Sequence, residues 1–226
     1  MCGRYTLHTS PQRIAELFDA QLAVGLADFV PRYNIAPTTP APVVRMADVG
    51  RVIELMRWGL IPHWSREPST KFATFNARSE DAAEKASYRG PMRYRRCLVP
   101  VDGFYEWRKR DRGPKQPYLF RMADDQPFAL AGLWDVWQDE LQSFSVLTTK
   151  ANTLMATIHD RMPVIVDPAD HARWLDPGLQ DPDAVADVLK PFPSELMLAT
   201  PVTTYVSNAR NEGPRCIEPV EPTIFD

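Results

Sequence analysis

Hydrophobic positions along the chain gather in short runs that are rich in β-branched and aromatic residues and separated by turn residues. Runs of this kind are typical of strands rather than helices. We expect strands at residues 42–46, 52–56, 97–107, 118–122, 128–137, 144–149 and 196–206. Their spacing predicts a curved, mostly antiparallel β-sheet or barrel at the centre of the fold.

A helical period appears at four places. Ser10 and Pro11 precede apolar residues at positions 14, 17 and 18, which is the pattern of an N-capped amphipathic helix with its apolar face in the core. Further helical patterns follow Ser79, span residues 151–158, and run from Pro168 to about Leu175. Together the elements predict an α+β fold in which peripheral helices surround a β-rich centre.

The composition is that of one ordinary folded domain. The chain has 226 residues, of which 44% are hydrophobic and 24% charged, so we expect a single domain over residues 1–226. The 22 prolines lie between the predicted strands and mark loops, of which residues 108–117 are the clearest exposed example. Because no apolar run could cross a membrane and the first residues lack a signal peptide's apolar segment, we expect a cytoplasmic protein.

Charge and cysteine content narrow the function further. A formal net charge of −3 argues against a protein that coats duplex DNA, but it allows a local basic groove. Cations cluster within residues 85–96 and 108–115, and such clusters are most often solvated surfaces. The three widely spaced cysteines fit neither a disulfide framework nor a zinc site, which favours a reducing compartment. With no metal-ligand spacing and no glycine-rich phosphate loop, we expect no metal and no cofactor.

Cys2 is the most informative single residue. A small side chain after Met1 is the situation in which the initiator methionine is normally removed, and removal would leave an amine and a thiol on adjacent carbons. Reference pKa values of about 7.7 to 8.0 for the amine and about 8.5 for the thiol would give both groups usable nucleophilic fractions. Such a pair reacts with aldehydes to form a Schiff base and then a five-membered thiazolidine. The alternative is a small apolar residue tucked in at the chain end.

Six sequence strings occur in the order and spacing of one known family: MCGRY at 1–5, RYNIAPT at 32–38, RWGLIPHW at 57–64, FNARSE at 75–80, CLVPVDGFYEW at 97–107 and IHDRMP at 158–163. In these strings the chain resembles the SOS response-associated peptidase (SRAP) family over almost its whole length. The resemblance implies a DNA-damage protein with an SRAP domain that binds single-stranded DNA and crosslinks abasic sites through Cys2. It also implies lyase activity, crosslink reversal and a peptidase activity that removes Met1.

The resemblance implies four catalytic residues, namely Cys2, Asn76, Glu106 and His159. Glu106 would relay protons as the closed abasic sugar opens to its aldehyde, and its alternative is a strand residue that faces water. His159 would shuttle protons at the imine or support strand scission, although a lone histidine is more often structural. Asn76 would orient the Cys2 amine through its side-chain carbonyl, and its alternative is a helix or turn cap.

The same resemblance implies DNA contacts at Arg4, Arg78 and Arg161 through phosphates, and at Trp64 through stacking on a base. Trp58, in contrast, is expected in the core. Asp160 adjoins Arg161, so an internal ion pair between them is an alternative to a phosphate contact.

Two other functions stay open on the residues alone. One is an N-terminal-nucleophile thiol hydrolase, of peptidase or amidotransferase type, with Cys2 as nucleophile and His159 as base. The other is a non-catalytic reader of single-stranded or modified DNA. For the leading hypothesis the partner is single-stranded DNA with abasic sites, and we expect a monomer that is nucleoid-associated when bound.

Overall fold

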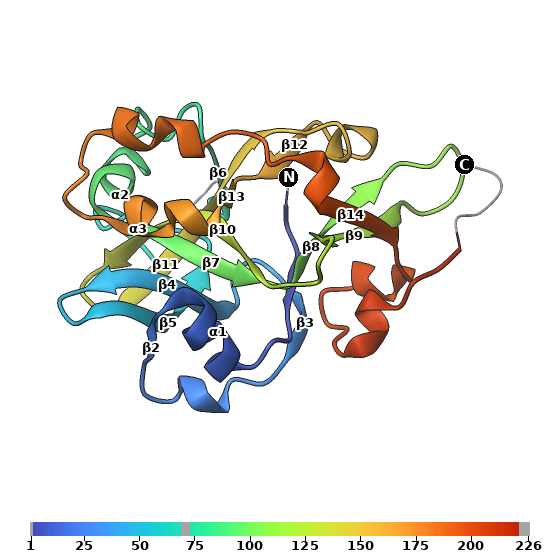
Figure 1. The fold of residues 1–226 in the computed structure, drawn as a ribbon, viewed down its shortest axis with the longest axis horizontal. Helices are drawn as coiled ribbons and strands as arrows, with labels where there is room; N and C mark the ends of the chain where they lie inside the picture. Colours follow the sequence, from blue (N-terminus) through green and yellow to red (C-terminus); the bar gives the residue numbers. More distant parts are fainter. Residues whose placement is uncertain (1, 69–72, 222–226) are drawn as a thin grey trace.

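Among the residues that the structure describes, five strands pair into a closed ring. This barrel lies in the left part of the molecule in Figure 1. The computed structural model describes residues 2–68 and 73–221. Every neighbouring pair in the ring is antiparallel except β5 with β11, which run parallel. The predicted curved, mostly antiparallel sheet is therefore confirmed, and it closes into a barrel. In order around the ring, the strands are β4 (Pro40–Ala47), β5 (Gly50–Trp58), β11 (Leu141–Lys150), β10 (Phe128–Trp137) and β7 (Arg96–Val101).

A second sheet of five strands extends from the barrel. The chain passes from barrel strand β7 into β8 of this sheet at Asp102, so the strand predicted over residues 97–107 is two strands. Asp102 accepts hydrogen bonds from the backbone N–H groups of His8 and Thr9, and its own N–H donates to the Thr6 carbonyl at 2.8 Å. The order in this sheet is β14 (Met197–Pro201), β9 (Gln116–Met122), β8 (Gly103–Arg108), β1 (Tyr5–Leu7) and β3 (Arg32–Ile35).

In residues 2–68 and 73–221, four strands of two or three residues, too short to leave a pattern in the sequence, pair with strands of the barrel. Two of them flank the end of β11: Asn76 pairs with Val146 on one side, and Arg161 pairs with Lys150 on the other. The four are β2 (Gln21–Leu22), β6 (Asn76–Arg78), β12 (Arg161–Pro163) and β13 (Ile165–Val166).

Within the described part of the chain, three short α-helices lie outside the barrel (Figure 1). The predicted helix α1 (Pro11–Phe18) begins where the Ser10 side chain accepts from the Arg13 N–H, and it buries Ile14 and Phe18. Leu17, expected in the core, is 37% exposed. The segment from Pro168 is also confirmed, as one 3₁₀ turn followed by α3 (His171–Leu175).

Two other helix predictions are wrong. Residues after Ser79 form turns, and residues 151–158 contain only the 3₁₀ turn Met155–Thr157. Short segments with little apolar surface to bury do not offset the entropy of starting a helix. Helix α2 (Arg89–Tyr94), which the pattern did not predict, forms instead, and it buries Pro91 and Met92. In residues 2–68 and 73–221, no helix has the length and apolar character that crossing a membrane requires.

We predict that Asp102→Asn will destabilise the fold by about 1 to 3 kcal/mol at pH 7, because partly buried N–H donors lose a charged acceptor. Burial by itself raises the pKa of Asp102, but hydrogen bonds from His8 and Thr9 outweigh it and hold the pKa below its ordinary value. Because the folded-state pKa is depressed, this stabilisation is present above the unfolded pKa and is lost as pH falls through the folded value. Urea unfolding between pH 7 and 2 should therefore show that the free energy of unfolding falls less with acid in the variant than in the wild type. Equal acid losses would contradict this role.

Candidate active site and DNA interface

Cys2 lies just before β1, and the pairing of β1 sets its surroundings. Tyr5 pairs with Phe104 in β8, and the Tyr105 N–H donates to the Arg4 carbonyl at 2.9 Å. Because antiparallel pairs follow one another in register, Gly3 falls opposite Glu106. Cys2 is fully buried at this point. The barrel and the second sheet together therefore hold the start of the chain against the Glu106 strand.

Burial is the main influence on the Cys2 thiol. It raises the pKa of Cys2, and the nearby negative charge of Glu106 raises it further, to about 12. In the folded chain the thiol pKa therefore lies well above the reference value of about 8.5. At neutral pH the thiol is protonated, and attack by a preformed thiolate is not the first step that this setting favours.

Asn76 is joined to Cys2 directly. Its side-chain nitrogen Nδ2 donates to the Cys2 carbonyl oxygen at 2.7 Å. Its side-chain oxygen Oδ1 is buried and accepts no hydrogen bond from the residues that the structure describes. Asn76 lies in strand β6, so the cap alternative is wrong. The amide is anchored through nitrogen, and its oxygen remains an acceptor for a donor near the Cys2 backbone.

Glu106 lies in β8 between two aromatic residues, Tyr105 and Trp107, and is 4% exposed. The alternative of a strand residue that faces water is therefore wrong. Its charge is felt at the Cys2 sulfur. A buried carboxyl beside a buried thiol is placed to accept and return protons during chemistry at Cys2.

His159 lies between the Met155–Thr157 turn and β12. The Arg161 backbone N–H donates to its Nδ1 at 3.0 Å, so the neutral ring carries its proton on Nε2. Asp160 Oδ1 is 2.9 Å from the same Nδ1, a contact that becomes an ion pair only when the ring is protonated. The Asp160 side chain, 87% exposed, thus lies beside the His159 ring, and among the described residues its contact is with this ring rather than with the Arg161 guanidinium.

The three predicted arginines differ in what they contact. Arg161 makes a two-point ion pair with Glu80 at 3.0 and 2.8 Å, so an internal partner exists, but it is not Asp160. Arg4 donates to Asn34 Oδ1 at 2.7 Å and to the Val206 carbonyl at 3.0 Å. Both guanidinium groups therefore hold parts of the protein together.

Arg78 is the exposed member of this set. It lies on β6, two residues beyond Asn76, and alternate residues of a strand point to the same face. The side chain makes no ion pair or hydrogen bond with the residues in the described ranges. Of the three arginines, Arg78 is the one best placed to meet a phosphate beside Cys2.

Trp64 is presented to solvent by a loop that is tightly held. Its side chain is 56% exposed, whereas Trp58 is fully buried, as expected. The neighbouring His63 contacts Asp135 Oδ2 through both its backbone N–H and its Nδ1, each at 3.0 Å. The Trp137 indole also donates to the Ser65 carbonyl at 2.8 Å. An exposed indole on a fixed loop is suited to stacking on an unpaired base.

Two residues that support the predicted site residues were not singled out from the sequence. Asn34 contacts Arg4, and Asp135 contacts His63 beside Trp64. Asn34 donates to the carbonyls of Val206, Asn208 and Asn211, which fixes the segment that Arg4 also contacts. Its position within the string RYNIAPT was the only available signal, because asparagine is common in ordinary turns.

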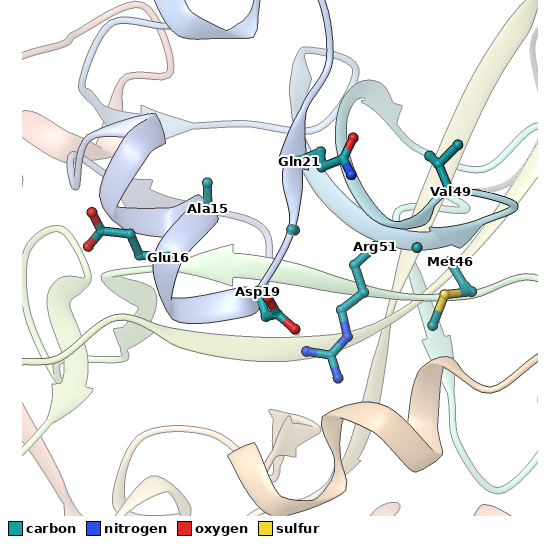
Figure 2. A pocket seen from close by; sticks show the side chains of 9 residues that line it. Ala15, Glu16, Asp19, Gln21, Met46, Val49 and Arg51 are labelled. Carbon is teal, nitrogen blue, oxygen red and sulfur yellow. The ribbon is translucent and has the colours of Figure 1, made fainter.

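A cavity of about 620 Å³ lies elsewhere, between α1 and the β4–β5 hairpin. Figure 2 shows Glu16 and Asp19 on its helix side and Met46 and Val49 on its hairpin side. None of the predicted site residues lines it. Chemistry at Cys2 therefore does not use this cavity.

The fold and site define a class of protein: a β-barrel whose candidate nucleophile is the second residue, held beside an asparagine and a glutamate. The sequence model of the SOS response associated peptidase (SRAP) family matches residues 1–209. The chain belongs to this family.

Relatives and solved structures agree with that assignment. The chain is 35% identical over 222 residues to the abasic site processing protein YoqW of Bacillus subtilis (strain 168), covering 96% of this chain and 99% of the relative. It is 36% identical over 225 residues to the abasic site processing protein HMCES of Xenopus tropicalis, covering 84% of this chain and 66% of the relative. A crystal structure of a protein from Bacteroides thetaiotaomicron superposes with a TM-score of 0.85 at 27% identity, covering 97% and 100% of the two chains.

We predict that Cys2 in the folded protein will react with iodoacetamide at pH 8 at least about 100-fold more slowly than in urea, because burial keeps the thiol protonated and shielded. Peptide mapping by mass spectrometry separates Cys2 from Cys97 and Cys216, which are also free and buried. Comparable rates in the folded and unfolded protein would contradict the buried, protonated thiol.

Proposed function

We propose that this protein senses and processes abasic sites in single-stranded DNA by capturing the sugar aldehyde with the amine and thiol of Cys2. Met1 lies outside the described residues, and its removal, by the protein itself or by another enzyme, is part of the proposal. The names of the relatives and the family membership support abasic-site processing. Single-strand preference, lyase activity and the peptidase step are the finer parts of the proposal.

The observation that carries the proposal is the buried, unpartnered Asn76 Oδ1 beside the Cys2 backbone, among the described residues. A free Cys2 amine could donate a hydrogen bond to this oxygen. That hydrogen bond would direct the lone pair of the amine outward. A nucleophile that is already oriented has lost its rotational freedom before the reaction begins. The activation barrier then does not include that entropy loss.

The proposed reaction forms two bonds and releases one water. The amine adds to the aldehyde carbon, and the carbinolamine loses water to give a Schiff base. The thiol then adds to the same carbon, its proton passes to the nitrogen, and a thiazolidine results. Glu106 relays protons while the sugar ring opens and the thiol closes the ring.

His159 acts at the imine in this proposal, where proton transfer supports strand scission by β-elimination or reversal of the link. Elimination removes a proton from the carbon next to the imine and expels the 3′ phosphate. We further propose that the protein acts as a cytoplasmic monomer that is nucleoid-associated when bound to DNA, with residues 1–226 as one SRAP domain.

The thiol-hydrolase alternative has weaker support, because it requires Cys2 as a thiolate and its pKa is about 12. A non-catalytic reader could use Trp64 and Arg78 alone, but it would give no role to the Asn76 and Glu106 arrangement. Covalent chemistry separates all three hypotheses.

We predict that the purified protein begins at Cys2 and forms, with abasic single-stranded DNA, an adduct of protein plus DNA minus one water, seen by denaturing gel and intact mass. The durable adduct should be abolished by acetylation of the Cys2 amine, and also by either substitution, Cys2→Ala or Cys2→Ser. In each case no stable ring can close. Glu106→Gln should slow capture by roughly 10²-fold. Asn76→Ala should slow it less, and His159→Ala should mainly affect scission or reversal.

Glu54→Gln is the matched control for Glu106→Gln, since Glu54 lies on barrel strand β5 and pairs with Arg45 at 2.8 Å. It should leave capture unchanged. A full adduct yield from the acetylated protein, or an active protein that retains Met1, would overturn the thiazolidine mechanism.

We predict different effects for the DNA-contact residues. Arg78→Gln should weaken single-stranded DNA binding and reduce the salt slope by about 0.7, as expected for one lost phosphate contact. Trp64→Ala should cost about 1 to 3 kcal/mol of binding. Arg161→Gln should chiefly lower the free energy of unfolding, because it breaks the Glu80 pair. Titrations at several salt concentrations and urea unfolding distinguish these results, and a larger binding defect for Arg161→Gln than for Arg78→Gln would reverse our assignment.

A further inference from the structure

The two basic clusters of the sequence, residues 85–96 and 108–115, differ in how many of their cations have partners inside the protein. In residues 85–96, several cations have internal partners. Arg95 pairs with buried Asp135 at 3.0 Å, and Arg96 is buried and donates to the carbonyls of Trp174 and Met92. Much of this cluster therefore stabilises the packing of α2 against the barrel, which leaves fewer cations for a ligand.

The second cluster stays on the surface. Residues 108–115 contain five cations and one carboxylate, and they connect β8 to β9. Lys109, Arg112 and Lys115 are exposed, and none of the three forms an ion pair or hydrogen bond within the described residues. The chain as a whole has a net charge of −3, so this hairpin is a local concentration of positive charge.

The base of the hairpin is fixed although its loop is exposed. Gln116 is buried and donates to the Val202 carbonyl at 2.7 Å, and Arg110 donates to the Gln116 side-chain oxygen. The Trp107 indole donates to the Ser207 hydroxyl at 3.0 Å. The cations are therefore held at a defined end of the molecule, opposite α2 (Figure 1).

The hairpin continues the strand that carries Glu106. Arg108 lies two residues beyond Glu106 on β8, and Arg112 is six residues beyond it. A fully extended chain of six residues spans at most about 20 Å. At a spacing of about 3.4 Å per nucleotide in a stacked strand, that reach corresponds to no more than about six nucleotides.

We propose that the 109–115 loop is a second DNA contact, which binds phosphates of the single strand on one side of the captured lesion. This inference rests on the proposed function, because it takes the lesion to lie at Cys2 and Glu106. Phosphates are the ligand chemistry that unpaired, exposed Lys and Arg side chains recognise, and one hairpin at one end can meet only one arm of the strand.

The test measures affinity for single-stranded oligonucleotides that carry one unreactive tetrahydrofuran abasic analogue and are lengthened by two to eight nucleotides on either the 5′ or the 3′ side. The wild-type protein should gain affinity from lengthening on one side only, and the gain should level off by about six nucleotides. Lys109→Gln with Arg112→Gln should remove that gain, weaken binding roughly 10-fold at 0.1 M salt and reduce the salt slope by about 1.4.

Arg89→Gln with Arg93→Gln is the matched control, because it removes two exposed cations at the opposite end of the molecule. It should bind like the wild type. A hairpin variant that keeps the one-sided gain, an equal loss for extensions on both sides, or a gain that requires a paired complementary strand would overturn the inference.

Adduct formation with a reactive abasic site, measured in the same proteins, separates a failure of the hairpin inference from a failure of the proposed function. If the wild type forms the adduct and the hairpin variant shows no length-dependent defect, only the hairpin inference fails. If the wild type forms no adduct, the proposed function itself fails.

Discussion

The pairing of β1 between β3 and β8 is the constraint on which the rest of this structure depends. Chain ends are usually exposed and mobile. Here main-chain hydrogen bonds on both sides of β1 hold the first residues inside the protein, and Asp102 secures the other end of the strand. Because the backbone is fixed, Cys2, Asn76 and Glu106 meet without relying on flexible side chains to find one another.

Burial of Cys2 has a chemical consequence. A thiol that is kept protonated is a poor first nucleophile, but it is also protected from alkylation and oxidation until a reaction partner arrives. In the proposed mechanism, the Cys2 amine that loss of Met1 would free has a different constraint, since it needs an acceptor and an unprotonated lone pair. The arrangement thus favours a reaction in which nitrogen attacks first and sulfur completes the ring.

The charged residues around the site fall into two groups, those that hold the protein together and those that are exposed and can contact a ligand. Arg4 and Arg161 have internal partners and support the segments near Cys2. Arg78 and the hairpin cations are exposed, where neutralising a phosphate costs less desolvation than it would in the interior. Trp64 is also exposed, and the proposed stacking on a base requires a free ring face of this kind. In the proposed mode of binding, a protein with a net charge of −3 would contact a polyanion only along this restricted path.

The sequence by itself determined the strand-rich α+β class, the helix α1, the segment from Pro168 and the family, because these depend on local periodicity, capping and strings of residues. It could not determine the ring closure through β5 and β11, the break at Asp102 or the short strand β6, because these depend on pairing between distant segments. The sequence left open whether Glu106 faces water and whether Arg161 has an internal partner, and for the Cys2 thiol it offered only a reference pKa. Each of these is set by neighbours that are remote in sequence, and burial and charge at a residue are properties of the assembled fold.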